Sequence, residues 1–223
     1  MNTLENPKII LAIESAISGG SLAMFRDSEL IGSKTGNSGV SRAEDLLLNI
    51  DELVAETIRD KRHLQEIVIS TGPGSFTGLR IGIATVMGLK RSLGIEVIGV
   101  SLFEEMARAF SCLGSVFTAV PMGKADVCIQ EFQNTEAASI AVDPPKTISR
   151  LEFKSLINIS AAASLILHAD LLQLDIDFVS IAGKGVKIID AGRDLASIIG
   201  LAANRRSTGT SLAPIYVQSP RFV

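Results

Sequence analysis

The spacing of apolar and polar positions divides the first 110 residues into alternating strands and helices. Apolar runs between Gly, Ser or Asp turns predict strands, the first three of them an antiparallel meander, over residues 8–15, 20–26, 29–34, 66–71 and 96–100. Apolar residues at helical spacing predict helices over residues 42–58, 77–93 and 102–110. Ser41 and Ser101 stand where helix N-caps are expected. The pattern therefore predicts one α/β lobe in this half.

The second half of the chain opens in the same way. Strand-like runs with polar or glycine breaks occupy residues 116–121, 127–133 and 139–142. Further on, the pattern predicts helices near residues 162–172 and 188–202, with a strand at 178–182 between them. Two successive units with the same opening predict a duplicated α/β fold of two related lobes. We place these lobes at residues 1–110 and 111–223.

The composition and charge argue against direct, tight binding of nucleic acid. The net charge is -3, and the basic clusters Lys61-Arg62 and Arg205-Arg206 are short. Cys112 and Cys128 lack metal-ligand spacing and give no sign of a disulfide framework. We find no signal-peptide pattern and no apolar run that approaches the length of a membrane span. We therefore expect a cytoplasmic protein without a membrane partner.

The stretch GPGSFTGLRIG, residues 72–82, joins a predicted strand to a predicted helix. Glycine-rich turns in this position often bind phosphate through backbone N–H groups, which leaves Gly74, Ser75 and Thr77 as candidate anion-binding residues. A Walker A loop is excluded, because Leu79 follows Gly78 where that loop needs a lysine. Ser75 has no neighbouring base, so we interpret it as a turn or capping serine.

Other residue types that carry chemistry are isolated. His63 and His168 lie in separate halves, and no pair of histidines has metal-ligand spacing. Glu14 and Asp126 stand at the ends of predicted strands, where ATPases of some α/β folds hold magnesium and water, but isolated acids at strand ends are common. We therefore assign no catalytic and no metal-binding residue.

Several segments together resemble the TsaB family, also called YeaZ. The most specific is GPGSFTGLRIG, preceded by EIVIST and followed by EVIGVSLFEEMA. Supporting matches are ILAIES, SGGSLAMF, LLLNIDELV and the C-terminal APIYVQS. The similarity covers the first 110 residues well and the second half loosely. It implies an actin-like, RNase H-like fold of two related lobes.

The resemblance also implies a function in making threonylcarbamoyladenosine in tRNA, beside the anticodon. In that family TsaB is a non-catalytic partner of its paralogue TsaD, which carries the metal and the transfer site, and the ATPase TsaE completes the bacterial set. The implied partners are thus a TsaD-like heterodimer partner and a TsaE-like ATPase, and the sequence leaves open whether the isolated chain forms a homodimer. ATP and a metal would belong to the partners, and tRNA would be bound only through the complex.

The chain departs from the family pattern at three places. Glu14-Ser15 stands where Asp-Thr is common, Arg42 where a histidine is frequent, and residues 121–124 replace an Asp-Ala-Arg element. These changes weaken any inherited nucleotide or metal site and fit a scaffold role. The alternative is an actin-fold kinase or ATPase that binds ATP in its own cleft. Its only glycine-rich candidate in the second lobe is Gly183-Lys184-Gly185, which is short.

The helix predicted over residues 77–93 is apolar on every side, which is typical of a helix that is buried on every side. Glycines in a helix interior cost about 1 kcal/mol each relative to alanine, so close approach of another element is the expected compensation. That element is either a partner protein or another helix of the same lobe. The predicted partner interface comprises Leu48, Ala55, Gly78, Gly82, Thr85 and Leu89.

Overall fold

Two mixed β-sheets form the framework of the protein. The computed structural model describes residues 7–36, 42–159, 164–174, 176, 182, 185–205 and 211–217. The first sheet has the order β3-β2-β1-β4-β5, with the bounds β1 (Ile9–Glu14), β2 (Ser21–Arg26), β3 (Glu29–Thr35), β4 (Glu66–Ser70) and β5 (Glu96–Val100). Strands β1 to β3 are antiparallel, whereas β4 and β5 run parallel to β1. This is the predicted meander followed by parallel strands.

The second sheet repeats this topology. Its strands are β6 (Gly114–Met122), β7 (Asp126–Asn134), β8 (Ser139–Ala141), β9 (Lys146–Ser149), β10 (Ser164–Leu167) and β11 (Lys187–Asp190). Read in the same direction as the first sheet, its order is β8-β7-β6-β10-β11, so each strand has a counterpart at the same position in the first sheet. Strand β9 also pairs with β7. Strands β6 to β8 are antiparallel, and β10 and β11 run parallel to β6. The predicted α/β, actin-like fold of two related lobes is therefore confirmed.

Two helix predictions in the second lobe are wrong. Within the segment 162–172 the structure has strand β10 and only a short helix, α5 (Ala169–Leu172). Within 188–202 it has strand β11 and then α7 (Leu195–Gly200). Strand β10 is buried on both faces and continuously apolar, so periodicity does not separate it from a buried helix, and β11 is an edge strand of four residues that is too short to show an alternation. Of the strand predicted at 178–182, all but residue 182 lies outside the described residues.

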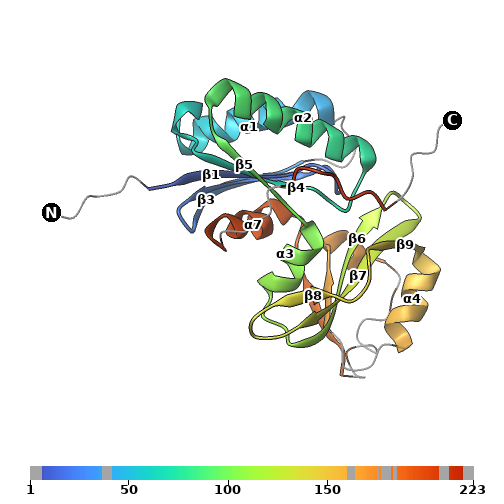
Figure 1. Cartoon of the computed structure of the whole chain (residues 1–223). Helices are drawn as coiled ribbons and strands as arrows, with labels where there is room; N and C mark the ends of the chain where they lie inside the picture. Colours follow the sequence, from blue (N-terminus) through green and yellow to red (C-terminus); the bar gives the residue numbers. More distant parts are fainter. Residues whose placement is uncertain are drawn as a thin grey trace.

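Helices cover and separate the two sheets in layers (Figure 1). On the outer face of the first sheet lie α1 (Arg42–Thr57) and α2 (Phe76–Leu93), which share one hydrophobic cluster with it. Between the sheets lie α3 (Leu102–Ala109) and α7. The outer face of the second sheet is covered by α4 (Arg150–Ile159) and α5. Short 3-10 helices, η1 (Lys61–His63) and η2 (Leu201–Arg205), complete the described elements.

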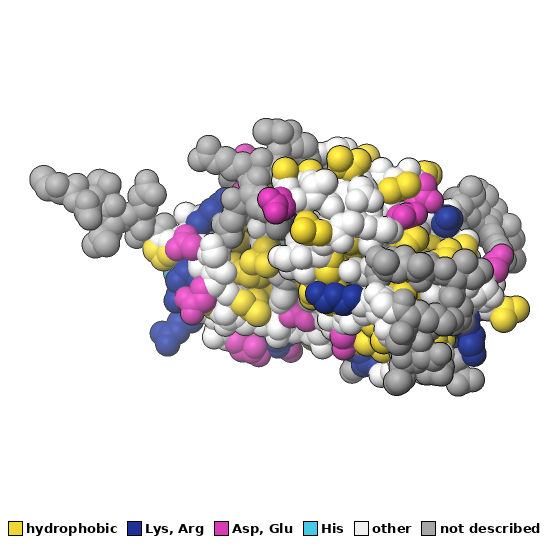
Figure 2. Space-filling model, turned by 90° about the horizontal axis from the view of Figure 1, so that it is seen from below, with side chains coloured by type: hydrophobic (Ala, Val, Ile, Leu, Met, Phe, Trp, Pro, Cys, Tyr) yellow, Lys and Arg dark blue, Asp and Glu magenta, His cyan; other side chains and the backbone are white. Residues whose placement is uncertain are grey.

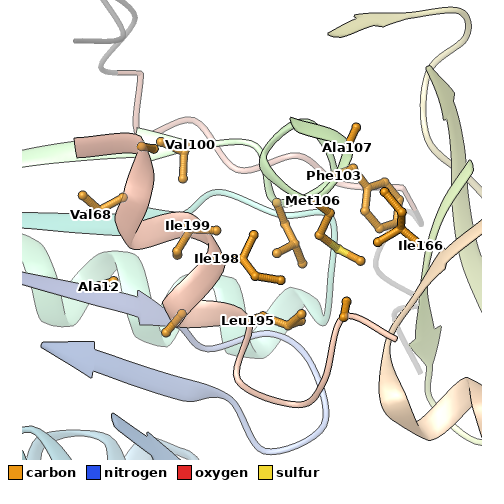
Figure 3. Packing of buried hydrophobic residues seen from close by; sticks show 14 of the residues in the cluster. Ala12, Val68, Val100, Phe103, Met106, Ala107, Ile166, Leu195, Ile198 and Ile199 are labelled. Atoms are coloured by element: carbon orange, nitrogen blue, oxygen red, sulfur yellow. The ribbon is translucent and has the colours of Figure 1, made fainter. Parts of the chain in front are cut away.

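The core between the sheets joins residues from both ends of the chain. Figure 3 shows Met106 of α3 beside Ile198 of α7, and Phe103 and Leu195 belong to the same cluster of buried side chains. The backbone N–H of Ala196 donates a hydrogen bond to Ser21 Oγ at 2.8 Å, which ties α7 to the first sheet. Burial of this apolar surface stabilises the lobes against each other.

The C-terminal segment 211–217 also returns to the first lobe. The N–H of Ile215 donates to the carbonyl oxygen of Thr71 at 2.7 Å, directly after β4. Gly99 in β5 has no side chain where the carbonyl oxygen of Ser211 approaches. The end of the chain therefore packs on the strand that leads into the glycine motif. The predicted boundary at residue 110 stays a prediction.

The surface offers no broad field of one charge on the face turned away from α1 and α2. Figure 2 shows Lys and Arg side chains on this face interspersed with Asp and Glu among the described residues. None of the described helices combines the length and apolar character that crossing a bilayer requires.

Candidate functional site

The glycine motif is a tightly packed turn between β4 and α2. Gly72 adopts φ +109°, which only glycine adopts readily. Gly74 lies so close to the β1–β2 turn that a side chain there would contact Ala16 Cβ at 2.5 Å. The N–H of Ser75 donates to the carbonyl oxygen of Ala16 at 3.0 Å, and Ser75 Oγ accepts the N–H of Gly78 at 3.4 Å. Ser75 is therefore the N-cap of α2, and Thr77 lies exposed beside it.

Glu14 ends β1 beside this turn, at a strand end where an acid could hold magnesium. Its side chain is 1% exposed. Its Oε1 accepts the backbone N–H groups of Ala16 at 2.6 Å and Ile17 at 3.1 Å. The neighbouring Ser15 Oγ donates to the carbonyl oxygen of Gly78 at 2.9 Å, which links β1 to α2. These groups hold the chain's own turn together, and the carboxylate does not face solvent.

A cavity of about 150 Å³ lies between the β1–β2 turn, the end of β3 and α1. The charged and amide side chains in its lining are those of Glu14, Lys34, Asp45 and Asn49. Hydrogen bonds with the carboxylates of Glu52 and Glu56 raise the pKa of Lys34, so this cation is already neutralised. Ligand pockets typically measure about 300–1,000 Å³. The cavity is therefore small for a nucleotide.

The remaining candidate residues are dispersed. Asp126 begins β7 on the second sheet, far along the chain from Glu14. Cys112 and Cys128 are buried free thiols, and burial raises the pKa of Cys128 to about 12. In the part of the chain that the structure describes, no three His, Cys, Asp or Glu side chains are grouped so that they could hold a metal ion. Of Gly183-Lys184-Gly185 only Gly185 is described, and the side chain of Arg42 is outside the described set.

His168 belongs to a polar cluster that joins the two lobes, which sequence reasoning did not find. It is 1% exposed and caps α5, with Nδ1 accepting the N–H of Asp170 at 3.1 Å. The carboxylate of Asp170 pairs with Arg193 at 2.7 Å and bonds the side chain of Ser18 in the first lobe. Because these residues are far apart in sequence, no local pattern signals the cluster. It is a structural contact between lobes.

The protonation of His168 makes this contact pH-sensitive. Burial lowers the pKa of His168 below its ordinary value of 6.5. Folding therefore favours the neutral ring. The free energy of unfolding has its full value above pH 6.5 and decreases as the pH falls from 6.5 through the lower pKa of the folded state, because the unfolded chain takes up the proton first. We expect the melting temperature to fall between about pH 7 and about pH 5 more steeply in the wild type than in His168→Asn, which caps without titrating. Parallel slopes in the two proteins would contradict this.

The outer surfaces of α1 and α2 carry the most prominent apolar exposure near the motif. Leu47 is 51%, Leu48 57% and Met87 48% exposed. We define the α1–α2 outer face by its exposed apolar and small residues, Leu47, Leu48, Ala55, Ala84, Met87 and Gly88. The two helices lie side by side on the first sheet (Figure 1). Scattered exposed leucines are ordinary, but exposed apolar residues on two helices that lie side by side are typical of a contact surface.

The residues predicted for the partner interface divide into three groups. Leu48 and Ala55 lie on the α1–α2 outer face, and Thr85 and Leu89 are half-buried on α2. Gly78 and Gly82 are buried against their own sheet. A side chain at Gly82 would overlap Ser15 Oγ and lie 3.0 Å from Ser15 Cβ and 3.2 Å from Ile69 Cδ1. The close approach that the glycines of α2 permit is thus to β1 and β4.

A family model described as TsaD, tRNA N6-adenosine threonylcarbamoyltransferase, matches residues 40–207 of the chain, which is more than half of it. A tRNA threonylcarbamoyladenosine biosynthesis protein TsaB from Buchnera aphidicola is 33% identical over 99 residues, 44% of this chain and 44% of that relative. TsaB from Escherichia coli K12 is 28% identical over 130 residues, 57% of this chain and 56% of that protein. The matched segments thus span about half the length of these curated relatives.

The fold is similar along nearly the whole chain to a solved structure from Pseudomonas aeruginosa. That structure is of an uncharacterized protein with similarity to peptidase YEAZ. The TM-score is 0.64 at 19% sequence identity, and the alignment covers 95% of this chain and 100% of that chain. At this identity the likeness shows a shared fold.

Proposed function

Because this chain belongs to the TsaB (YeaZ) branch of the threonylcarbamoyltransferase family, we propose that it is a non-catalytic subunit of the machinery that makes threonylcarbamoyladenosine in tRNA. In this proposal it binds and activates a TsaD-like transferase. The transferase and a TsaE-like ATPase use ATP and a metal, and tRNA is bound only by the assembled complex. The chain contributes a surface and no reacting group.

The observation that carries the proposal is the exposure of apolar side chains on the α1–α2 outer face. Leu47, Leu48 and Met87 each keep about half of their side-chain surface in contact with solvent. Covering such groups with a complementary surface releases apolar area from water, at about 25 cal/mol per Å². Interfaces draw most of their affinity from a few well-packed apolar anchors, and these three residues are the candidates.

The contacts at the glycine motif favour this scaffold role over an actin-fold kinase or ATPase. A phosphate site needs backbone N–H groups that point into a cleft. Here the N–H groups of Ser75 and Gly78 donate within the chain, and Glu14 accepts from its own turn. The motif thereby fixes the start of α2, which carries half of the proposed contact surface.

The proposal is tested by titrating the chain with the TsaD-like protein of the same organism in a calorimeter, and by titrating the chain alone with Mg-ATP. We expect saturable binding of the protein partner and no heat with the nucleotide. Micromolar affinity for Mg-ATP in the isolated chain, without binding of the transferase, would instead support the kinase or ATPase alternative.

A further inference from the structure

Two arginines stand at the ends of the exposed stripe of α2. Arg80 and Arg91 are exposed, with Ala84, Met87 and Gly88 between them. They are eleven residues apart, which is three helical turns, so both point to the same side with their Cα atoms about 16 Å apart. The α1–α2 outer face therefore has an apolar centre with a cation at each end of its α2 half.

The guanidinium of Arg80 is held against an aromatic ring. Its guanidinium lies 3.7 Å from the centroid of the Phe76 ring, and Phe76 packs on Tyr216 with a centroid distance of 4.8 Å. Among the described residues, neither Arg80 nor Arg91 has an acidic partner within ion-pair distance. Stacking leaves the N–H edge of a guanidinium free to bind a carboxylate, and a fixed side chain loses little entropy on binding.

The position of Arg80 is not explained by the stability of the helix. It lies in the second turn of α2, beyond the first turn in which the helix dipole acts, so the dipole gives no reason for a cation there. Arg91 lies in the last turn, where the dipole favours it. A stacked cation that neither the dipole nor an acidic partner in the described structure stabilises points to a partner outside this chain.

In the part of α1 whose side chains are described, the exposed acids already have partners. The three exposed acids in the described part of α1 are Asp51, Glu52 and Glu56. Asp51 pairs with Lys61, and both glutamates pair with Lys34. Among the described residues, Arg80 and Arg91 are therefore cations without an acidic partner beside the apolar centre of this face.

We propose that this charge pattern selects an acidic partner over a second copy of this chain, an inference that rests on the proposed function. In an antiparallel pair of α2 helices centred between Ala84 and Gly88, Arg80 of each copy would face Arg91 of the other. Like charges that meet in an interface weaken it, whereas carboxylates at both ends of a partner helix strengthen it. The favoured occupant is thus a helical face of the transferase that carries Asp or Glu about three turns apart.

The test compares Arg80→Glu, Arg80→Glu/Arg91→Glu and the neutral Arg80→Gln with a control, Arg150→Glu, which makes the same charge change on α4. Binding of the TsaD-like protein is measured by calorimetry at low and high salt, and self-association by sedimentation velocity. We expect Arg80→Glu to weaken partner binding by about tenfold or more and Arg80→Gln by less, with no change for Arg150→Glu. Arg80→Glu should also increase self-association, because the new carboxylate of one copy then faces Arg91 of the other, and the double variant should reverse this gain.

The two arms separate this inference from the proposed function. If the wild-type chain does not bind the transferase, the proposed function fails, and the sedimentation arm still decides the charge argument. The inference is overturned if Arg80→Glu binds the transferase as tightly as the wild type does. It is also overturned if the wild type forms a dimer whose affinity is the same in all of these variants.

Discussion

Replacing Leu48 and Met87 together by glutamine is expected to weaken binding of the TsaD-like partner by about 2–4 kcal/mol, the range of apolar anchor residues. Both side chains are about half exposed in the isolated chain, so their loss removes contact area in the complex and little core packing. Glutamine is a good helix former and leaves the charge of the surface unchanged. Titration calorimetry gives the affinity, and thermal melting confirms that the variant is folded.

The matched control for this pair is Leu151→Gln. Leu151 is 74% exposed on α4, on the outer side of the second lobe. The substitution makes the same leucine-to-glutamine change at a position away from α1 and α2, so partner binding should be unchanged. Equal losses of affinity in the control and in the double variant would mean that the α1–α2 outer face is not the binding surface.

Gly82→Ala is expected to destabilise the chain by about 1–3 kcal/mol, the usual effect of overpacking a core. The new methyl group would overlap Ser15 Oγ, and rotation of that hydroxyl does not relieve the contact with Ser15 Cβ at 3.0 Å. The rotation would also break the hydrogen bond from Ser15 to Gly78, which joins β1 to α2. Urea unfolding followed by circular dichroism measures the free energy of unfolding.

Gly88→Ala supplies the comparison within the same helix. Nothing lies within 4 Å of a Cβ at Gly88, so alanine there should stabilise the chain by about 0.5–1 kcal/mol through its helix propensity. The opposite order of stability for the two variants would show that α2 turns a different face to the sheet.

The sequence predicted the first lobe well because its elements carry clear signals. The strands of the meander end at short turns, and the helices begin at capping serines, as at Ser75 and Ser101. In the second lobe β10 is buried along its whole length in a parallel sheet, which removes the alternation that marks a half-exposed strand, and the edge strand β11 is too short to show one. Local pattern alone does not separate these cases.

The candidate surface was predicted in part. The glycines and apolar residues of α2 indicated close packing, but a helix that is apolar on every side does not reveal which side meets its own sheet. The structure separates Gly82, which faces Ser15, from Gly88, which is open. The contact of Phe76 with Tyr216 and the bond between Ser18 and Asp170 join residues far apart in sequence, so only the folded chain brings them together.

The central claim is that this chain supports threonylcarbamoyladenosine synthesis through its surface and without a reacting group of its own. The most direct measurement is the amount of this nucleoside formed in tRNA, determined by mass spectrometry, in a reaction of the TsaD-like and TsaE-like proteins with and without this chain. We predict formation only when the chain is present, full formation with Glu14→Gln, and a strong reduction with Leu48→Gln/Met87→Gln. Equal formation without the chain, or loss with Glu14→Gln but not with the double variant, would contradict the claim.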